Sequence, residues 1–197
     1  MDNLKLRTDE QLVALYSSGV NEAFDTLLMR HKDRLYSYIF YIVHNADIAD
    51  DLFQETFVKA IMTIRQGRYV ETGKFYAWLT RIAHNLIIDQ FRTEKNENTI
   101  SNEEAGTDLF NNAALSDSST ESRLIAEQTL NDVCRLMEHL PENQREVVHM
   151  RYYQNLSFKE ISDITGVSIN TALGRMRYAI LNMRRMAEEN HISLHLG

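Results

Sequence analysis

The chain is poor in the residues that build disulfides, turns and membrane spans. Its 197 residues include one cysteine, one proline and seven glycines. The single cysteine, Cys134, excludes an internal disulfide and a multi-cysteine zinc site, and its place in an apolar helical pattern predicts a buried thiol. No apolar run approaches the ~18 residues that span a bilayer, and the N-terminus lacks a secretory core, so we expect a cytoplasmic protein.

Groups that would support catalysis or hold a cofactor are also missing from the sequence. We find no nucleophile with a paired base, no phosphate-binding loop and no cluster with metal-ligand spacing. His191 and His195 are four residues apart, but they lie in a short tail without a third ligand. His31 falls on the apolar stripe of its helix and is interpreted as a packed core histidine. We therefore expect no catalytic residue, no metal and no cofactor.

Helical periodicity dominates what is present. Apolar residues recur three and four positions apart over long stretches, which predicts an all-α protein. From Thr93 to Ser122 this period is broken, and the segment holds seven Asp and Glu against one Lys, which indicates a flexible acidic linker. The sequence therefore predicts two small helical domains, and the expected ranges are 1–92 for the first domain, 93–120 for the linker, 121–190 for the second domain and 191–197 for a tail.

The segment from Leu156 to Arg185 has the pattern of two short helices joined by a glycine turn. Ser157 and Glu160 form a potential capping box, Gly166 supplies a left-handed turn position, and Ser168 can cap the second helix. This arrangement is typical of a helix-turn-helix.

The second of these helices divides into two faces and has no acid from Ser168 to Ala187. The residues expected to pack inward are Ile169, Ala172, Met176, Ile180 and Met183. Those expected to face outward are Asn170, Thr171, Gly174, Arg177 and Tyr178. The exposed N-terminal half of such a helix recognises base edges in the major groove, and Arg177 is the best candidate for a base or phosphate contact. A solvated face of an ordinary helical hairpin is the alternative.

The net charge of −7 predicts weak DNA binding by the isolated chain, because non-specific affinity comes mostly from phosphate neutralisation. Charge acts locally, within about 8 to 10 Å at physiological salt, so a basic surface can coexist with an acidic total. We therefore expect another molecule to supply affinity.

The first domain is expected to open with a capping box at Thr8 and Gln11, followed by helices near residues 22–44, 46–64 and 75–92. In the helix after Asn45, an inward stripe comprises Phe53, Phe57, Ala60 and Ile64. The opposite side gathers Asp47, Asp50, Asp51, Gln54 and Glu55. Leu52 lies at the edge of this polar side and is a candidate apolar anchor for a docking partner. A merely solvated face fits equally well.

Aromatic and basic residues alternate between Arg65 and Asn85. The aromatic members are Tyr69, Phe75, Tyr76 and Trp78, and the basic members are Arg65, Arg68, Lys74 and Arg81. Aromatic side chains stack on exposed bases while basic groups follow the backbone, so this stretch predicts contact with single-stranded nucleic acid. A buried aromatic cluster is the alternative, and it is preferred for Phe75, whereas strand contact is preferred for Trp78 and Asn85.

These motifs resemble those of a known family. Residues 51–57 (DLFQETF) and 75–85 (FYAWLTRIAHN) are similar to region 2 of the extracytoplasmic-function sigma factors, a subfamily of the sigma-70 family of bacterial RNA polymerase. Residues 140–146 (LPENQRE) and 156–185 resemble region 4 of the same family. The similarity covers both expected domains in the family's order.

For region 2, the resemblance implies two contacts. Docking on the clamp helices of the largest catalytic subunit of the polymerase would involve Asp51, Leu52, Gln54, Glu55 and Phe57. Melting of the minus-10 element, with a flipped base of the non-template strand held near the loop from Gly67 to Lys74, would involve Arg68, Tyr69, Lys74, Tyr76, Trp78, Arg81 and Asn85.

For region 4, the resemblance implies recognition of the minus-35 element as duplex. The expected residues are Ser168, Asn170, Thr171, Gly174, Arg175, Arg177 and Tyr178. The chain departs from the family pattern at Leu173 and Gly174, where a basic residue and a serine are frequent, and at Tyr178, where arginine is usual. Promoter sequence therefore does not transfer from other members.

The resulting hypothesis is a sigma factor, not an enzyme, whose partners are core RNA polymerase and promoter DNA, both as duplex and as non-template single strand. An anti-sigma factor is a further candidate partner. One rival is a stand-alone helix-turn-helix regulator that binds a duplex operator without polymerase, usually as a dimer. A DNA-acting enzyme such as a recombinase is a second rival, which the missing catalytic constellation disfavours.

Overall fold

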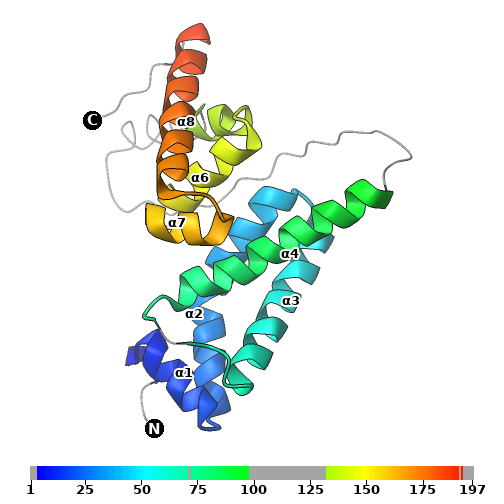
Figure 1. The fold of residues 1–197 in the computed structure, drawn as a ribbon, viewed down its shortest axis with the longest axis vertical. Coiled ribbons are helices and arrows are strands. Elements are labelled where there is room, and N and C mark those ends of the chain that lie inside the picture. The colour runs from blue at the N-terminus through cyan, green and yellow to red at the C-terminus, as the bar shows by residue number, and fades with distance from the viewer. Residues whose placement is uncertain (1–3, 71, 98–131, 191, 193–197) are drawn as a thin grey trace, which may run out of the picture. The chain divides into compact units, whose positions relative to one another are not determined.

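The computed structural model describes residues 4–70, 72–97, 132–190 and 192 (Figure 1). All regular elements within these residues are helices, which confirms the predicted all-α class. The chain divides into two compact units, one centred on helices α1 to α4 and one on helices α6 and α8. None of the described helices is long and apolar enough to cross a membrane. The tail histidines His191 and His195 and most of the predicted linker lie outside the described residues.

Helices α1 (Asp9–Ser17), α2 (Asn21–Val43), α3 (Ala46–Arg65) and α4 (Phe75–Glu97) form the first unit, preceded by a short 3-10 turn at Leu4–Leu6. The predicted capping box is confirmed, because the Gln11 N–H donates to Thr8 Oγ1 (3.3 Å) and the Thr8 N–H donates to Gln11 Oε1 (3.2 Å). Helix α2 ends at His44, which adopts a left-handed conformation with φ of 51°. Asn45 then caps α3 through its side chain, so two residues suffice to reverse the chain.

Packing of α4 against both α2 and α3 encloses the core of the first unit. Leu27, Leu35 and Ile39 of α2 are fully buried, as are Ala60 of α3 and Leu79 of α4. Each fully buried leucine or isoleucine contributes roughly 1.5–3 kcal/mol relative to an exposed one.

Helix α4 is longer than the sequence pattern suggested. It continues to Glu97, whereas we expected it to end at Arg92 and the linker to begin at Thr93. The Thr93 hydroxyl donates to the carbonyl of Asp89 (3.1 Å), and the Gln90 amide donates to Glu94 (2.9 Å). Glu94 and Lys95 are good helix formers, so the acidic composition that marked a linker is compatible with further helical turns.

The second unit contains a helical stretch at residues 132–138, then α6 (Glu142–Tyr152), residues 158–162 of α7 (Phe158–Thr165) and α8 (Ile169–Glu189). Pro141 stands at the N-cap of α6 with φ of −51°, so this proline opens the helix. The core includes Leu136, Val147, Met150 and Ile161.

Two burial predictions for this unit were wrong in part. Ile169 and Ile180 of α8 are 44% and 36% exposed, whereas Ala172, Met176, Ala179 and Ala187 are buried. The contact face of α8 is made largely of alanines, whose small side chains allow close helix approach, and this rotates the face away from the larger apolar residues. Cys134 is half-buried rather than buried, with its Sγ 3.6 Å from the Tyr153 hydroxyl.

Candidate nucleic-acid interface

Every predicted stop and start signal of the helix-turn-helix is present between Ser157 and Thr171. The Glu160 N–H donates to Ser157 Oγ (3.3 Å), and the Ser157 N–H donates to Glu160 Oε2 (2.8 Å), which completes the capping box. Gly166 has φ of 69°, and the Ser162 hydroxyl donates to the Val167 carbonyl (2.6 Å) across the turn. Ser168 then caps α8 by accepting from the Thr171 N–H (3.0 Å). Local hydrogen bonds therefore fix the angle at which α8 leaves the turn.

Most of the α8 residues predicted to face outward are exposed. Asn170, Thr171 and Arg177 are exposed, and Tyr178 is 62% exposed, while Gly174 and Arg175 are half-buried. Ser168 is exposed, but its hydroxyl is occupied by the cap. The sequence interpretation did not select Leu173, which is 43% exposed on the same half of α8. Helix α8 has no acid before Glu188, and with its positive N-terminal dipole end it suits contact with an anionic duplex.

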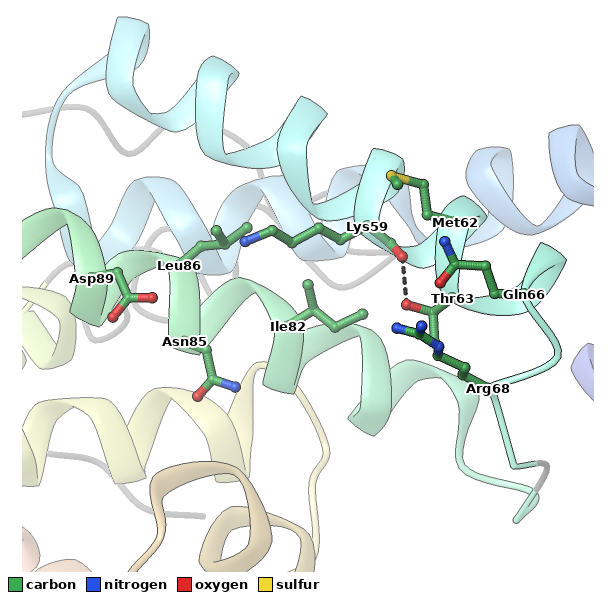
Figure 2. A pocket seen from close by; sticks show the side chains of 9 residues that line it. All are labelled: Lys59, Met62, Thr63, Gln66, Arg68, Ile82, Asn85, Leu86 and Asp89. Atoms are coloured by element: carbon green, nitrogen blue, oxygen red, sulfur yellow. Dashed lines mark hydrogen bonds between the residues drawn. The ribbon is translucent and has the colours of Figure 1, made fainter.

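In the first unit, a groove of about 470 Å³ lies between α3 and α4 (Figure 2). Met62, Ile82 and Leu86 provide its apolar part. Its polar lining residues are Lys59, Thr63, Gln66, Arg68, Asn85 and Asp89. Figure 2 shows the Lys59 side chain extended along the groove toward Leu86, and the Thr63 hydroxyl donates to the Lys59 carbonyl (2.7 Å). A groove that combines apolar side chains with polar groups can hold the apolar faces and polar edges of a small ligand or a base.

The sequence analysis predicted only some of the residues that line this groove. Arg68 and Asn85 were predicted as site residues, and the groove brings them together across the α3–α4 boundary. Lys59, Gln66 and Asp89 were missed as site residues. The signal for Asp89 was present, since it follows Asn85 by one helical turn, but the contribution of α3 required the packing of the two helices.

The predicted stacking surface is a packed aromatic cluster at the start of α4. The ring centroids of Tyr69 and Trp78 are 4.4 Å apart, and those of Phe75 and Trp78 are 5.6 Å apart. Phe75 is 1% exposed, which confirms its assignment to the core. Trp78 and Tyr69 are half-buried. Lys74, directly before α4, and Arg81, in the second turn of α4, are exposed.

Tyr76 does not present a ring to solvent, and its expected availability for strand contact was wrong. It is 7% exposed, stacks on His31 (5.3 Å between centroids) and lies under the guanidinium of Arg34 (3.8 Å). Burial raises the pKa of Tyr76 to about 12. Tyr76 precedes Trp78 by two residues and so points to the opposite side of α4, toward α2.

The histidine prediction in the same neighbourhood is confirmed. His31 is 7% exposed and belongs to the packed interior, where its Nε2 lies 2.8 Å from Asp9 Oδ2.

The polar face of α3 is exposed, but its expected apolar anchor is not. Asp47, Asp50, Asp51, Gln54 and Glu55 are all exposed. Leu52 is 5% exposed and Phe57 is 6% exposed, so neither is available on the surface. Because α3 packs on both α2 and α4, its buried arc extends from the phenylalanine stripe across Ala49, Leu52 and Thr56.

Two apolar side chains that the sequence analysis did not select are exposed on the polar face of α3. Val58 and Met62 are 52% and 53% exposed, at successive four-residue steps from Gln54. Their spacing from Gln54 was the available signal, because residues four apart share a helix face.

Comparison with known proteins identifies both units. Residues 27–97 match the model of sigma-70 region 2, and residues 130–175 match that of sigma-70 region 4. The extracytoplasmic-function (ECF) RNA polymerase sigma factor SigM of Bacillus subtilis is 31% identical over 144 residues, which cover 73% of this chain and 82% of SigM. SigW of the same organism is 28% identical over 161 residues, which cover 80% of this chain and 85% of SigW.

Solved structures show the same fold at lower identity. The sigma factor RpoE of Bartonella quintana, in complex with the anti-sigma factor NepR, has a TM-score of 0.65 and 22% identity, and the match covers 84% of this chain and 96% of RpoE. CnrH in complex with the cytosolic domain of CnrY has a TM-score of 0.61 and 22% identity, with 93% and 99% of the two chains covered.

Proposed function

The chain belongs to the extracytoplasmic-function subfamily of the sigma-70 factors, which are transcription initiation factors, and we propose how its two units divide that work. The second unit recognises the minus-35 element as duplex. Residues on the exposed side of α8 carry this contact, with Arg177 as the principal base or phosphate ligand and Asn170 and Thr171 beside it. Their exposure and the rigid cap at Ser168 support this assignment.

The first unit contacts the non-template strand of the minus-10 element. Arg68, Lys74 and Arg81 follow the strand backbone, and the half-buried Trp78 and Tyr69 stack on bases. The groove beside Asn85 receives an extruded base. Extrusion costs a few kcal/mol of unstacking, and an apolar cleft with polar groups at its edge can offset that cost. Tyr76 is omitted from this contact because it is buried.

Docking on core polymerase uses the exposed face of α3. Asp51, Gln54 and Glu55 supply its polar contacts, and Val58 takes the role of apolar anchor that the sequence suggested for Leu52. A central apolar group surrounded by polar residues is a common composition for a binding hot spot. Leu52 and Phe57 support this face from within the core.

Polymerase converts two weak DNA contacts into one specific contact. With a net charge of −7, the chain neutralises few phosphates by itself. When both units are held on one polymerase, the second contact forms at high effective concentration. We further propose that the chain catalyses no reaction itself, acts in the cytoplasm, and is regulated by an anti-sigma factor, as the complex of RpoE with NepR suggests.

The observation that carries this proposal is the presence in one chain of a capped helix-turn-helix and a basic, aromatic helix beside a groove. The test is a gel-shift assay with and without core polymerase, followed by transcription from a template library. A promoter complex that requires polymerase supports the proposal. Tight duplex binding without polymerase would instead favour the stand-alone regulator.

A further inference from the structure

Arg34 of α2 is held in place by an aromatic ring. Its guanidinium lies 3.8 Å from the centroid of the Tyr76 ring, and the side chain is half-buried. Tyr76 is itself fixed, because it is 7% exposed and also stacks on His31, one helical turn before Arg34. A cation over a ring gains about 0.5–2 kcal/mol, so this contact orders the guanidinium before any ligand arrives.

The charge of Arg34 is not neutralised within the described part of the chain. Arg30, one turn earlier on α2, pairs with Asp9, whereas no described carboxylate lies within ion-pair distance of Arg34. Its Nε is buried without a hydrogen-bond acceptor. Stacking does not satisfy the guanidinium N–H donors, and leaving a partly desolvated charge unpaired is unfavourable. An anionic ligand would remove this penalty.

The location of Arg34 indicates which anion that would be. Tyr76 lies in the first turn of α4, and two further basic residues stand at the same end of this helix, Lys74 directly before it and Arg81 in its second turn. Arg81 is exposed and Ala77 is half-buried. Arg34 therefore adds a third positive charge at this end of α4, on the side that faces α2.

We propose that Arg34 is a binding site for a backbone phosphate of the promoter strand that crosses α4. Arginine suits this ligand because its planar fork matches phosphate oxygens and remains charged at every relevant pH. The contact is independent of base sequence, and it holds the strand where it passes over the start of α4 toward the groove between α3 and α4. This inference rests on the proposed contact between α4 and the minus-10 strand.

The test is the salt dependence of promoter binding by the reconstituted holoenzyme. Wild type and Arg34→Gln are titrated with a promoter fragment that carries a pre-melted minus-10 region, between about 50 and 200 mM salt. Loss of one phosphate contact on a single strand should reduce the slope of log K against log salt by about 0.7. The affinity should fall about tenfold at low salt. Arg34→Lys should keep the slope and show an intermediate affinity.

The matched control is Arg135→Gln, which removes the same charge from an exposed side chain of the second unit. Its slope should remain that of the wild type, and thermal unfolding checks that the Gln and Lys variants at residue 34 are folded. An unchanged slope for Arg34→Gln, or a slope that falls equally in Arg34→Lys, overturns the proposal. Loss of core polymerase affinity with unchanged promoter binding also overturns it, because Arg34 would then pair with an acid of the polymerase. If the wild-type holoenzyme engages no promoter, the proposed function itself fails.

Discussion

Asp9 and His31 are joined across the first unit, with Oδ2 of the Asp9 carboxylate 2.8 Å from Nε2 of His31. The other carboxylate oxygen pairs with Arg30, and the Arg30 guanidinium also donates to the backbone carbonyls of Lys5 (3.2 Å) and Arg7 (2.9 Å). One carboxylate at the start of α1 thereby fixes the orientation of α2 beneath the first turn of α4, where Tyr76 stacks on His31.

The first unit should lose stability in acid through Asp9. Burial alone would raise the Asp9 pKa, but hydrogen bonds and charge from His31 and Arg30 outweigh it and lower the pKa below its usual value of 3.8. A carboxylate with a lowered folded pKa stabilises the protein above its unfolded pKa, and this contribution disappears as the pH falls below about 4. Urea unfolding between pH 3 and 7, followed by Trp78 fluorescence, should show less acid dependence in Asp9→Asn. Asp33→Asn, an exposed change on α2, should behave as wild type; equal profiles for all three proteins would contradict the assignment.

Leu52→Ala should destabilise the first unit by about 2–5 kcal/mol, because it opens a cavity in a packed core. Leu52 is 5% exposed, so loss of polymerase binding by Leu52→Asp would report unfolding and not a missing contact. Trp78 is the only tryptophan of the chain, and its fluorescence in urea reports this unit alone. A wild-type midpoint for Leu52→Ala would refute the buried assignment.

Val58→Asp should reduce core polymerase binding by about tenfold or more while changing stability by only ~0.5 kcal/mol. The reason is that Val58 is 52% exposed on the same face as Gln54 and Glu55. Met29→Asp makes the same chemical change at a 62% exposed residue of α2 and should bind polymerase normally. A pull-down in which both variants retain core polymerase equally would exclude Val58 as an anchor.

Arg177→Ala should weaken holoenzyme binding to its promoter by about 1–3 kcal/mol, roughly 5- to 150-fold, because each good base contact contributes about that much. Polymerase binding should be unaffected, since the residue lies on the exposed side of α8. The measurement is a gel shift with holoenzyme, with Arg135→Ala as the control for lost charge. Equal losses for Arg177→Ala and Arg135→Ala would mean that Arg177 acts only through bulk charge.

In the folded chain, His149 should remain neutral at pH values well below the ordinary histidine pKa. Burial lowers its pKa to about 3, and its ring stacks on Tyr153 at 5.1 Å. In the unfolded chain it takes up a proton near pH ~6.5, so between that pH and about 3 the unfolded state binds more protons and stability falls as the pH falls. NMR of the His149 ring should show no titration above pH 4, and His149→Phe should flatten the pH dependence of the second unit. A ring that titrates near pH 6 would show that the site is open to water.

Features that depend only on nearby residues of the chain were predicted correctly from the sequence. The caps at Thr8, Ser157 and Ser168 form as predicted, because each depends on hydrogen bonds within a few residues of the chain. Errors arose where a residue's surroundings come from other helices. Leu52 lies on α3, which packs against α1, α2 and α4, so a single apolar stripe underestimated the buried arc of this helix. Tyr76 lies in a basic and aromatic stretch of the sequence, which suggested contact with a DNA strand, but its ring packs against residues of α2.

The order of residues alone determined the helical class, the helix-turn-helix and the resemblance of both units to a sigma factor, because periodicity, capping and motif spacing are properties of a continuous segment. Only the tertiary structure decided which side chains meet. The groove joins Lys59 of α3 to Asn85 of α4, and Arg34 of α2 is stacked on Tyr76 of α4. Such contacts depend on how helices rotate and cross when they exclude water between them, and no single segment encodes that geometry.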